Sequence, residues 1–139
     1  MAVKRFRSRK IGEILGPTSD YTQYEVPEKT KVQDVAKQLE QNAYHMVTVV
    51  DKNRIPVGLV TQTDLVRKIG SGINLGPSQE VEDVINRDFM RVSEDASIDA
   101  ALNLMNASNV NKLVIVRTDG TFRGVIHKSD IARAVQRLL

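Results

Sequence analysis

An internal duplication is the feature of this sequence that most constrains its fold. Sliding the 139-residue chain along itself by 66 positions aligns residues 26–66 with residues 92–132 without a gap. Few identities survive, but the apolar positions coincide almost throughout, and Asp64 meets Asp130. Such a repeat indicates two copies of one supersecondary unit, each with too little core to fold alone.

The first part of each copy has the periodicity of an amphipathic helix. Apolar residues recur at i, i+3, i+4 and i+7 over residues 32–39 and again over residues 98–105, which places them on one helical face. Thr30, followed three residues later by Gln33, predicts a capping box at the start of the first of these helices.

A hairpin and a closing helix follow in each copy. The β-branched runs are residues 46–50 and 112–116, and each leads through a short polar turn into a second apolar run. The closing helices are predicted over about residues 62–69 and 128–139. Each copy therefore has the order strand, helix, strand, strand, helix, which predicts an α/β (α+β) fold.

Four segments are expected along the chain. They are a basic N-terminal tail at 1–10, a first repeat at 11–69, a linker at 70–80 and a second repeat at 81–139. The linker contains several glycines, which suggests a flexible connection, and it is too short to hold the two repeats apart.

The basic residues are unevenly placed, although the net charge is only +3. Those of the N-terminal tail are Lys4, Arg5, Arg7, Arg9 and Lys10. Such a run can attract nucleic acid or phosphate, whereas a frayed, solvated terminus explains it without any partner. Because Phe6 is the only aromatic residue in the run, the frayed terminus is favoured.

Composition and motifs exclude several classes of function. The chain has no cysteine, which removes disulfides, thiolate metal sites and cysteine nucleophiles. No apolar run approaches the roughly 20 residues of a membrane span, and no secretory signal is visible, so we expect a cytoplasmic protein. Since no Ser–His–Asp constellation, metal cluster or Walker-type glycine loop is present either, we do not expect an enzyme.

The end of each hairpin resembles a known family pattern. Residues 58–64, Gly-Leu-Val-Thr-Gln-Thr-Asp, look like the CBS pattern of Gly, two apolar residues, Thr or Ser, two variable residues and Asp. Residues 124–130 keep both ends but place His127 where the family usually has a hydroxyl. With two such copies, the chain resembles a tandem CBS pair, also called a Bateman module. In that fold two β-α-β-β-α repeats pack through their sheets with pseudo-twofold symmetry.

The resemblance implies a non-catalytic regulatory module of the energy-sensing kind. Such modules bind an adenine nucleotide of the AMP, ADP or ATP type, with or without Mg²⁺, in the cleft between the two repeats. They signal by a change of conformation or association. A homodimer formed through the helices, and a separate target protein, are the partners that this implies, with no membrane and no nucleic acid.

The resemblance also assigns residues to two clefts. The Asp of each pattern would bond the ribose hydroxyls, the hydroxyl residue would lie near the phosphates, and the first two strands would hold adenine. The first cleft would use Asp64, Thr61, Tyr24, Val26, Val47, Thr48 and Val49. The second would use Asp130, His127, Arg91, Val92, Leu113, Val114 and Ile115. A carboxylate suits a cis-diol, and a helix start suits a phosphate.

Other interpretations of the same residues stay open. Thr61 and Asp64 also fit a helix capping box that requires no ligand. His127 would be a poor cap, which weakens that explanation for the second copy. The competing functions are a structural or interaction domain with empty clefts, and nucleic-acid binding through the basic N-terminus.

Overall fold

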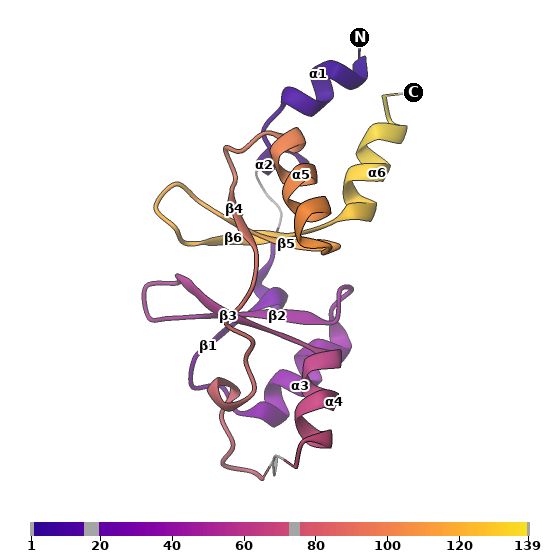
Figure 1. The fold of residues 1–139 in the computed structure, drawn as a ribbon. Helices are drawn as coiled ribbons and strands as arrows, with labels where there is room; N and C mark the ends of the chain where they lie inside the picture. The colour runs from indigo at the N-terminus through magenta and orange to yellow at the C-terminus, as the bar shows by residue number, and fades with distance from the viewer. Residues whose placement is uncertain (1, 16–19, 73–75, 139) are drawn as a thin grey trace. The chain divides into compact units, whose positions relative to one another are not determined.

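The computed structural model describes residues 2–15, 20–72 and 76–138, and it contains two compact units. Unit 1 joins Met1–Asp20 to Met90–Leu139, and unit 2 is Tyr21–Phe89. Each unit holds one three-stranded sheet with helices (Figure 1). The fold is therefore mixed α+β, as expected. Residues 73–75 of the predicted linker and residue 139 of the predicted closing helix lie outside the described residues.

Unit 2 carries strands and helices of the first repeat and one short helix from the start of the second repeat. They are η1 (Thr22–Tyr24), β1 (Glu25–Pro27), α3 (Val32–Gln41), β2 (Met46–Val50), β3 (Pro56–Thr61), α4 (Gln62–Gly70) and η2 (Val81–Asp83). Strand β1 runs parallel to β2, and β2 runs antiparallel to β3. Helices α3 and α4 both cover one face of this sheet (Figure 1).

The apolar stripe of α3 packs on that face as the periodicity predicts, because Val32, Val35 and Leu39 are buried. The predicted capping box at its start is wrong. The N-cap residue is Lys31, which makes no side-chain cap bond, and the Thr30 hydroxyl instead donates to the Pro27 carbonyl at 2.8 Å. The helix begins one residue later than a Thr30 cap requires.

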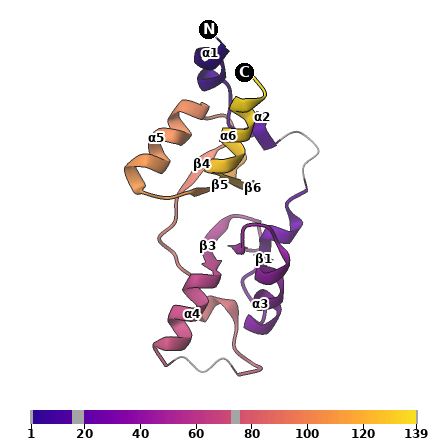
Figure 2. The same ribbon diagram turned by 90° about the vertical axis from the view of Figure 1, so that its right-hand side faces the viewer.

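Unit 1 carries two helices from the N-terminal part of the chain and the strands and helices of the second repeat. They are α1 (Ala2–Ser8), α2 (Gly12–Leu15), β4 (Arg91–Ser93), α5 (Ile98–Ser108), β5 (Lys112–Val116), β6 (Phe122–His127) and α6 (Lys128–Gln136). Strand β4 is parallel to β5, and β5 is antiparallel to β6. Helices α5 and α6 lie on the same side of this sheet (Figure 2). The Ser97 hydroxyl caps α5 by accepting from the Ala100 N–H at 3.0 Å.

The core of unit 2 is completed by a segment from the start of the second repeat. Val81 and Val84 are fully buried and belong to the apolar cluster of unit 2. The Val81 N–H donates to the Thr30 carbonyl at 2.8 Å, and Leu59 and Asn86 exchange backbone hydrogen bonds of 2.9 and 2.8 Å. Residues 81–86 therefore extend the first repeat's fold.

Unit 1 is completed in the same way by a segment that precedes the first repeat's strands. Ile11 and Leu15 are buried, the Ile11 N–H donates to the Ala96 carbonyl at 2.7 Å, and the Gly12 N–H donates to the Glu94 carbonyl at 2.9 Å. A Cβ at Gly12 would lie 2.9 Å from the Glu94 Cβ, so this close approach requires glycine. The compact units are thus not the sequence repeats themselves.

The glycine of the first CBS-like pattern has the same kind of explanation. A Cβ built on Gly58 would lie 2.9 Å from the Ile85 Cδ1 and 3.0 Å from the Asn86 carbonyl oxygen. The segment after η2 can therefore pair with β3 only where β3 lacks a side chain. Gly58 serves the packing of unit 2.

The basic N-terminus is a docked helix, so the prediction of a frayed terminus is wrong. Helix α1 contacts α5, and Phe6 is only 4% exposed. The Arg7 Nε donates to the Asp99 carboxylate at 2.8 Å, and the Lys10 ammonium lies 3.2 Å from Asp95. The two acidic partners are Asp99 in α5 and Asp95 just before it, and nothing in the sequence around α1 identifies them. No helix in the described ranges combines the length and apolar character needed to cross a bilayer.

Candidate functional site

The junction between β3 and α4 carries the first candidate site. Thr61 ends β3 and is the N-cap of α4. Its Oγ1 accepts from the Asp64 N–H at 3.0 Å, while the Asp64 Oδ2 accepts from the Thr61 N–H at 3.2 Å. The predicted capping box is confirmed. It satisfies two backbone amides that the first turn of a helix otherwise leaves without partners.

The capping box uses only part of the hydrogen-bonding capacity of these two side chains. The Asp64 Oδ1 is 3.9 Å from the guanidinium of Arg67, whose side chain is 75% exposed, so this contact is weak. Oδ1 can therefore accept from a ribose hydroxyl while Oδ2 holds the helix. The Thr61 oxygen accepts from the helix, which leaves its proton to donate to a phosphate.

The three tyrosines of the chain cluster at the end of the sheet where β1 and β2 begin and β3 finishes. The ring centroid of Tyr24 is 5.6 Å from that of Tyr21 and 5.5 Å from that of Tyr44. The Gln62 N–H donates to the His45 carbonyl at 3.3 Å, which holds the turn before β2 against the start of α4. The predicted site residue Tyr24 thus lies near the capping box, where an aromatic surface suits a flat base.

The strand residues predicted to hold adenine point in two directions. Val26, Val47 and Val49 belong to the apolar cluster that α3 covers. Because side chains alternate along a strand, Thr48 points to the opposite face, where Glu25 is its partner across β1 and β2. Of the predicted β2 residues, the structure therefore places only the Thr48 side chain on the face away from the helices.

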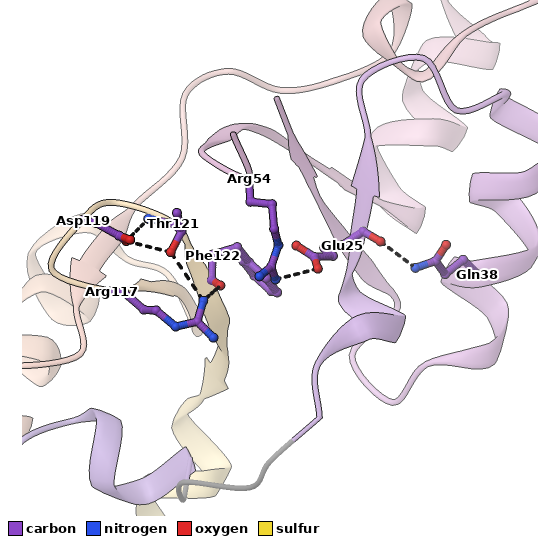
Figure 3. A network of polar contacts seen from close by, with 7 residues as sticks. All are labelled: Glu25, Gln38, Arg54, Arg117, Asp119, Thr121 and Phe122. Carbon is purple, nitrogen blue, oxygen red and sulfur yellow. Dashed lines mark hydrogen bonds and ion pairs between the residues drawn. The ribbon is translucent and has the colours of Figure 1, made fainter. Parts of the chain in front are cut away.

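Glu25 and Thr48 place two unsatisfied polar atoms in one cross-strand pair. Arg54 donates to the Glu25 Oε1 at 2.8 Å (Figure 3). The Glu25 Oε2 and the Thr48 Oγ1 are buried and have no hydrogen-bond partner in the part of the chain that is described. Such buried atoms are rare and require an explanation. Glu25 lies within the stretch from Tyr24 to Val26 that the resemblance assigns to adenine, and the register places it beside Thr48.

The corresponding junction of unit 1 is closed by its own side chains. The Nδ1 of His127 caps α6 by accepting from the Ser129 N–H at 3.0 Å, and the Asp130 Oδ2 accepts from the His127 N–H at 2.8 Å. The prediction that His127 is a poor cap is wrong, because an unprotonated imidazole nitrogen is as much an acceptor as a hydroxyl. Arg133 binds the Asp130 Oδ1, so both oxygens of this carboxylate have partners.

The predicted strand residues of unit 1 are mostly apolar and buried. Leu113, Val114 and Ile115 are at most 1% exposed. Arg91 pairs with Val114 in the register, as Val92 does with Ile115. The positions equivalent to Glu25 and Thr48 are therefore an arginine and a valine, and this sheet carries neither the carboxylate nor the hydroxyl at these positions.

Two shifted pKa values occur in unit 1. Hydrogen bonds from the backbone N–H and then the hydroxyl of Thr121 lower the pKa of Asp119, at 3.0 and 2.7 Å respectively (Figure 3). This carboxylate holds its own hairpin turn. Partial burial lowers the pKa of Lys112, at the start of β5, below its ordinary value of 10.5.

Comparison with known sequences gives the family. The CBS domain model matches residues 11–71 and 81–137. An uncharacterized 17.7 kDa protein of Acidianus ambivalens is 26% identical over 112 residues, which cover 81% of this chain and 66% of that protein. The match therefore spans slightly less than two thirds of the relative's length.

Solved structures show the same fold at low sequence identity. A CBS domain protein from Pyrobaculum aerophilum complexed with AMP has a TM-score of 0.75 and 20% identity, with 92% of this chain and 95% of that chain covered. The protein CbpB in complex with c-di-AMP has a TM-score of 0.79 and 18% identity, covering 99% and 91%. With a family model on both repeats and the hairpin–helix junction present in each, this chain belongs to the CBS domain family and contains two CBS repeats.

Proposed function

We propose that this chain is a non-catalytic regulatory module that binds an adenine nucleotide at the start of α4. The observation that carries the proposal is the Asp64 carboxylate, which holds the capping box through Oδ2 and has only a weak, exposed contact at Oδ1. The similar structures with bound AMP and c-di-AMP support this class of ligand.

Each part of a nucleotide has a matching group in unit 2. The Asp64 Oδ1 would accept from the ribose hydroxyls, and the Thr61 hydroxyl and the first amides of α4 would face the phosphate. Tyr24, within its tyrosine cluster, would lie against the base. No group of three or more possible metal ligands occurs in the described ranges, so we propose that Mg²⁺ enters with the phosphates of ADP or ATP.

We propose one such site in each chain. The capping carboxylate of unit 1 is bound by Arg133 as well as by the helix, and the His127 Nδ1 accepts from the Ser129 N–H and lies 2.8 Å from the Ser129 hydroxyl. A nucleotide at this junction would have to displace contacts that already stabilise the fold. We therefore propose that the second set of predicted site residues serves unit 1 itself.

Titration calorimetry with AMP, ADP and ATP tests the binding, and tyrosine fluorescence gives a second readout because all three tyrosines lie in unit 2 near α4. We expect a dissociation constant below 1 mM with at least one nucleotide. Asp64→Ala should abolish this binding. No heat and no fluorescence change with any nucleotide would favour a structural domain with empty clefts.

The second repeat offers a matched control for this variant. Asp130→Ala removes the same capping-box carboxylate from α6, so both variants should lose about 1 kcal/mol of unfolding free energy. Only Asp64→Ala should lose its affinity for the nucleotide. Equal affinity in the two variants would mean that Asp64 acts solely as a helix cap.

We infer that the module signals by a change in its association. A ligand shifts an equilibrium only when it binds the two states with unequal affinity, and the two states proposed here are the monomer and the dimer. Val66 and Ile69 of α4 are 68% and 52% exposed, and we propose that a second copy covers them in a homodimer. Val66→Glu should then yield a monomer in analytical ultracentrifugation. We propose that the module acts in the cytoplasm on a separate target protein.

Nucleic-acid binding is not favoured, because Arg7 and Lys10 are paired with acidic side chains of unit 1.

A further inference from the structure

We propose that Glu25 and Thr48 recognise the exocyclic amino group of the bound adenine, and this inference rests on the nucleotide site proposed at α4. It assigns base selectivity to two side chains on the face of the unit 2 sheet that the helices leave uncovered.

The register of the sheet gives the two groups a suitable position. Met46 pairs with Thr61, at the start of α4, and Thr48 pairs with Glu25 two residues further along β2. Side chains two residues apart lie on the same face, about 7 Å from each other along the strand. That spacing is comparable to a purine ring system. A nucleotide with its ribose at Asp64 can therefore bring the edge of its base to Glu25 and Thr48.

The chemistry of the pair matches the amino edge of adenine. A carboxylate oxygen accepts hydrogen bonds, so the buried Glu25 Oε2, which has no partner among the described residues, can accept from an amino group. The Thr48 hydroxyl can donate to a ring nitrogen beside that donor. Because Arg54 binds the Glu25 Oε1, the carboxylate is held in place with one oxygen left for the base.

A hollow of about 440 Å³ borders Glu25 on the side away from α4, toward the end of β2 that pairs with Pro56. It lies beside β1 and the β2–β3 hairpin. Its lining residues are Thr22, Glu25, Pro27, Val50, Asp51, Lys52 and Arg54. Pro27 and Val50 are paired in the same register that pairs Glu25 with Thr48, so they share its face of the sheet.

The test compares AMP with the 5′-monophosphate of unsubstituted purine riboside, which differs only by lacking the amino group. A hydrogen bond from this group to a buried carboxylate should make AMP bind about 10- to 100-fold more tightly to the wild type. Glu25→Ala should bring this ratio close to one. Arg54→Ala is the matched control, because it removes the ion pair but keeps the carboxylate, and it should retain the preference for AMP.

Variants of Thr48 give a second, independent test. Thr48→Val is nearly isosteric and reproduces the residue found at Val114 in the other repeat, whereas Thr48→Ser keeps the hydroxyl. Thr48→Val should bind AMP about tenfold more weakly, and it should melt at a higher temperature without ligand because it no longer buries an unpaired hydroxyl. Thr48→Ser should keep the affinity of the wild type.

The outcomes separate the two proposals. Tight AMP binding with a ratio that falls in Glu25→Ala and stays in Arg54→Ala supports the inference. Equal binding of AMP and the purine nucleotide by the wild type, or tighter binding of IMP or GMP, overturns it and leaves nucleotide binding at α4 intact. If the wild type binds no nucleotide, both proposals fail together.

Discussion

Truncating Val84 to alanine tests whether residues 81–86 belong to the core of unit 2. Val84 is fully buried in the same apolar cluster as Val35 of α3 and Val47 of β2. The substitution deletes two buried carbon atoms, worth about 1.6 kcal/mol in transfer free energy, and leaves a cavity that the neighbours only partly fill. We expect a loss of about 2–3 kcal/mol in the free energy of unfolding.

Gln33→Ala is the control, since it truncates an exposed side chain of α3, the helix whose buried face packs in the same cluster as Val84. Its effect should stay within about 0.5 kcal/mol of the wild type. Urea unfolding followed by circular dichroism measures both variants, and an unchanged m-value would show that the comparison concerns stability alone.

Hydrogen exchange then locates the loss. Amides of α3 and β2 should exchange faster in Val84→Ala, because local opening of unit 2 costs less once its core has a cavity. The reasoning is refuted if Val84→Ala is no less stable than Gln33→Ala. It is also refuted if the faster exchange appears in β5 and β6 of unit 1.

Two further predictions concern unit 1. Burial lowers the pKa of Lys112, so the charged form of this lysine disfavours folding. The wild type should therefore become more stable as the pH rises from the lowered pKa of the folded state toward 10.5, the ordinary value. Lys112→Met, which introduces the residue that the first repeat has at Met46, should melt higher at pH 7 and lose this advantage near pH 10.5; a constant advantage would contradict the cause given. His127→Ala should cost about 1 kcal/mol by removing the cap of α6, whereas His127→Thr should restore it, and equal melting temperatures of the two variants would show that the cap contributes nothing.

Local sequence patterns predicted the regular elements well. Strands β2 and β5 have the predicted limits, residues 46–50 and 112–116, because each is a β-branched run that ends at a polar turn. The apolar stripes of α3 and α5 are buried as expected. These features depend on residues close together in the sequence, which is the information that periodicity contains.

The composition of the two units could not be predicted in this way. Residues 11–15 and 81–85 correspond in the sequence, but each packs in the unit formed by the other repeat's strands. An apolar stripe shows that a face is buried and does not show against which element. The docking of α1 could not be predicted for the same reason. This helix contacts α5, far along the chain, and Arg7 binds Asp99 there.

Side-chain direction in the candidate site was also hidden from the sequence. All five residues of β2 are buried, so polarity does not reveal which of them face the helices. The structure separates Val47 and Val49 from Thr48, and it brings Glu25 beside Thr48. A pair of this kind forms across two strands, and only the register can identify it.

Comparing the two repeats shows which of their shared residues point to a ligand. Both closing helices begin with a reciprocal capping box, so an aspartate at this position is required by the fold whether or not a nucleotide binds. The two units differ in the hydrogen-bonding capacity that remains once the capping box has formed. Unit 2 retains a weakly paired Asp64 oxygen and two buried polar atoms without partners among the described residues, whereas unit 1 binds both Asp130 oxygens and has Arg91 and Val114 at the equivalent strand positions. Unsatisfied polar groups reduce stability unless something binds them, and their position in unit 2 is the physical reason to seek the ligand there.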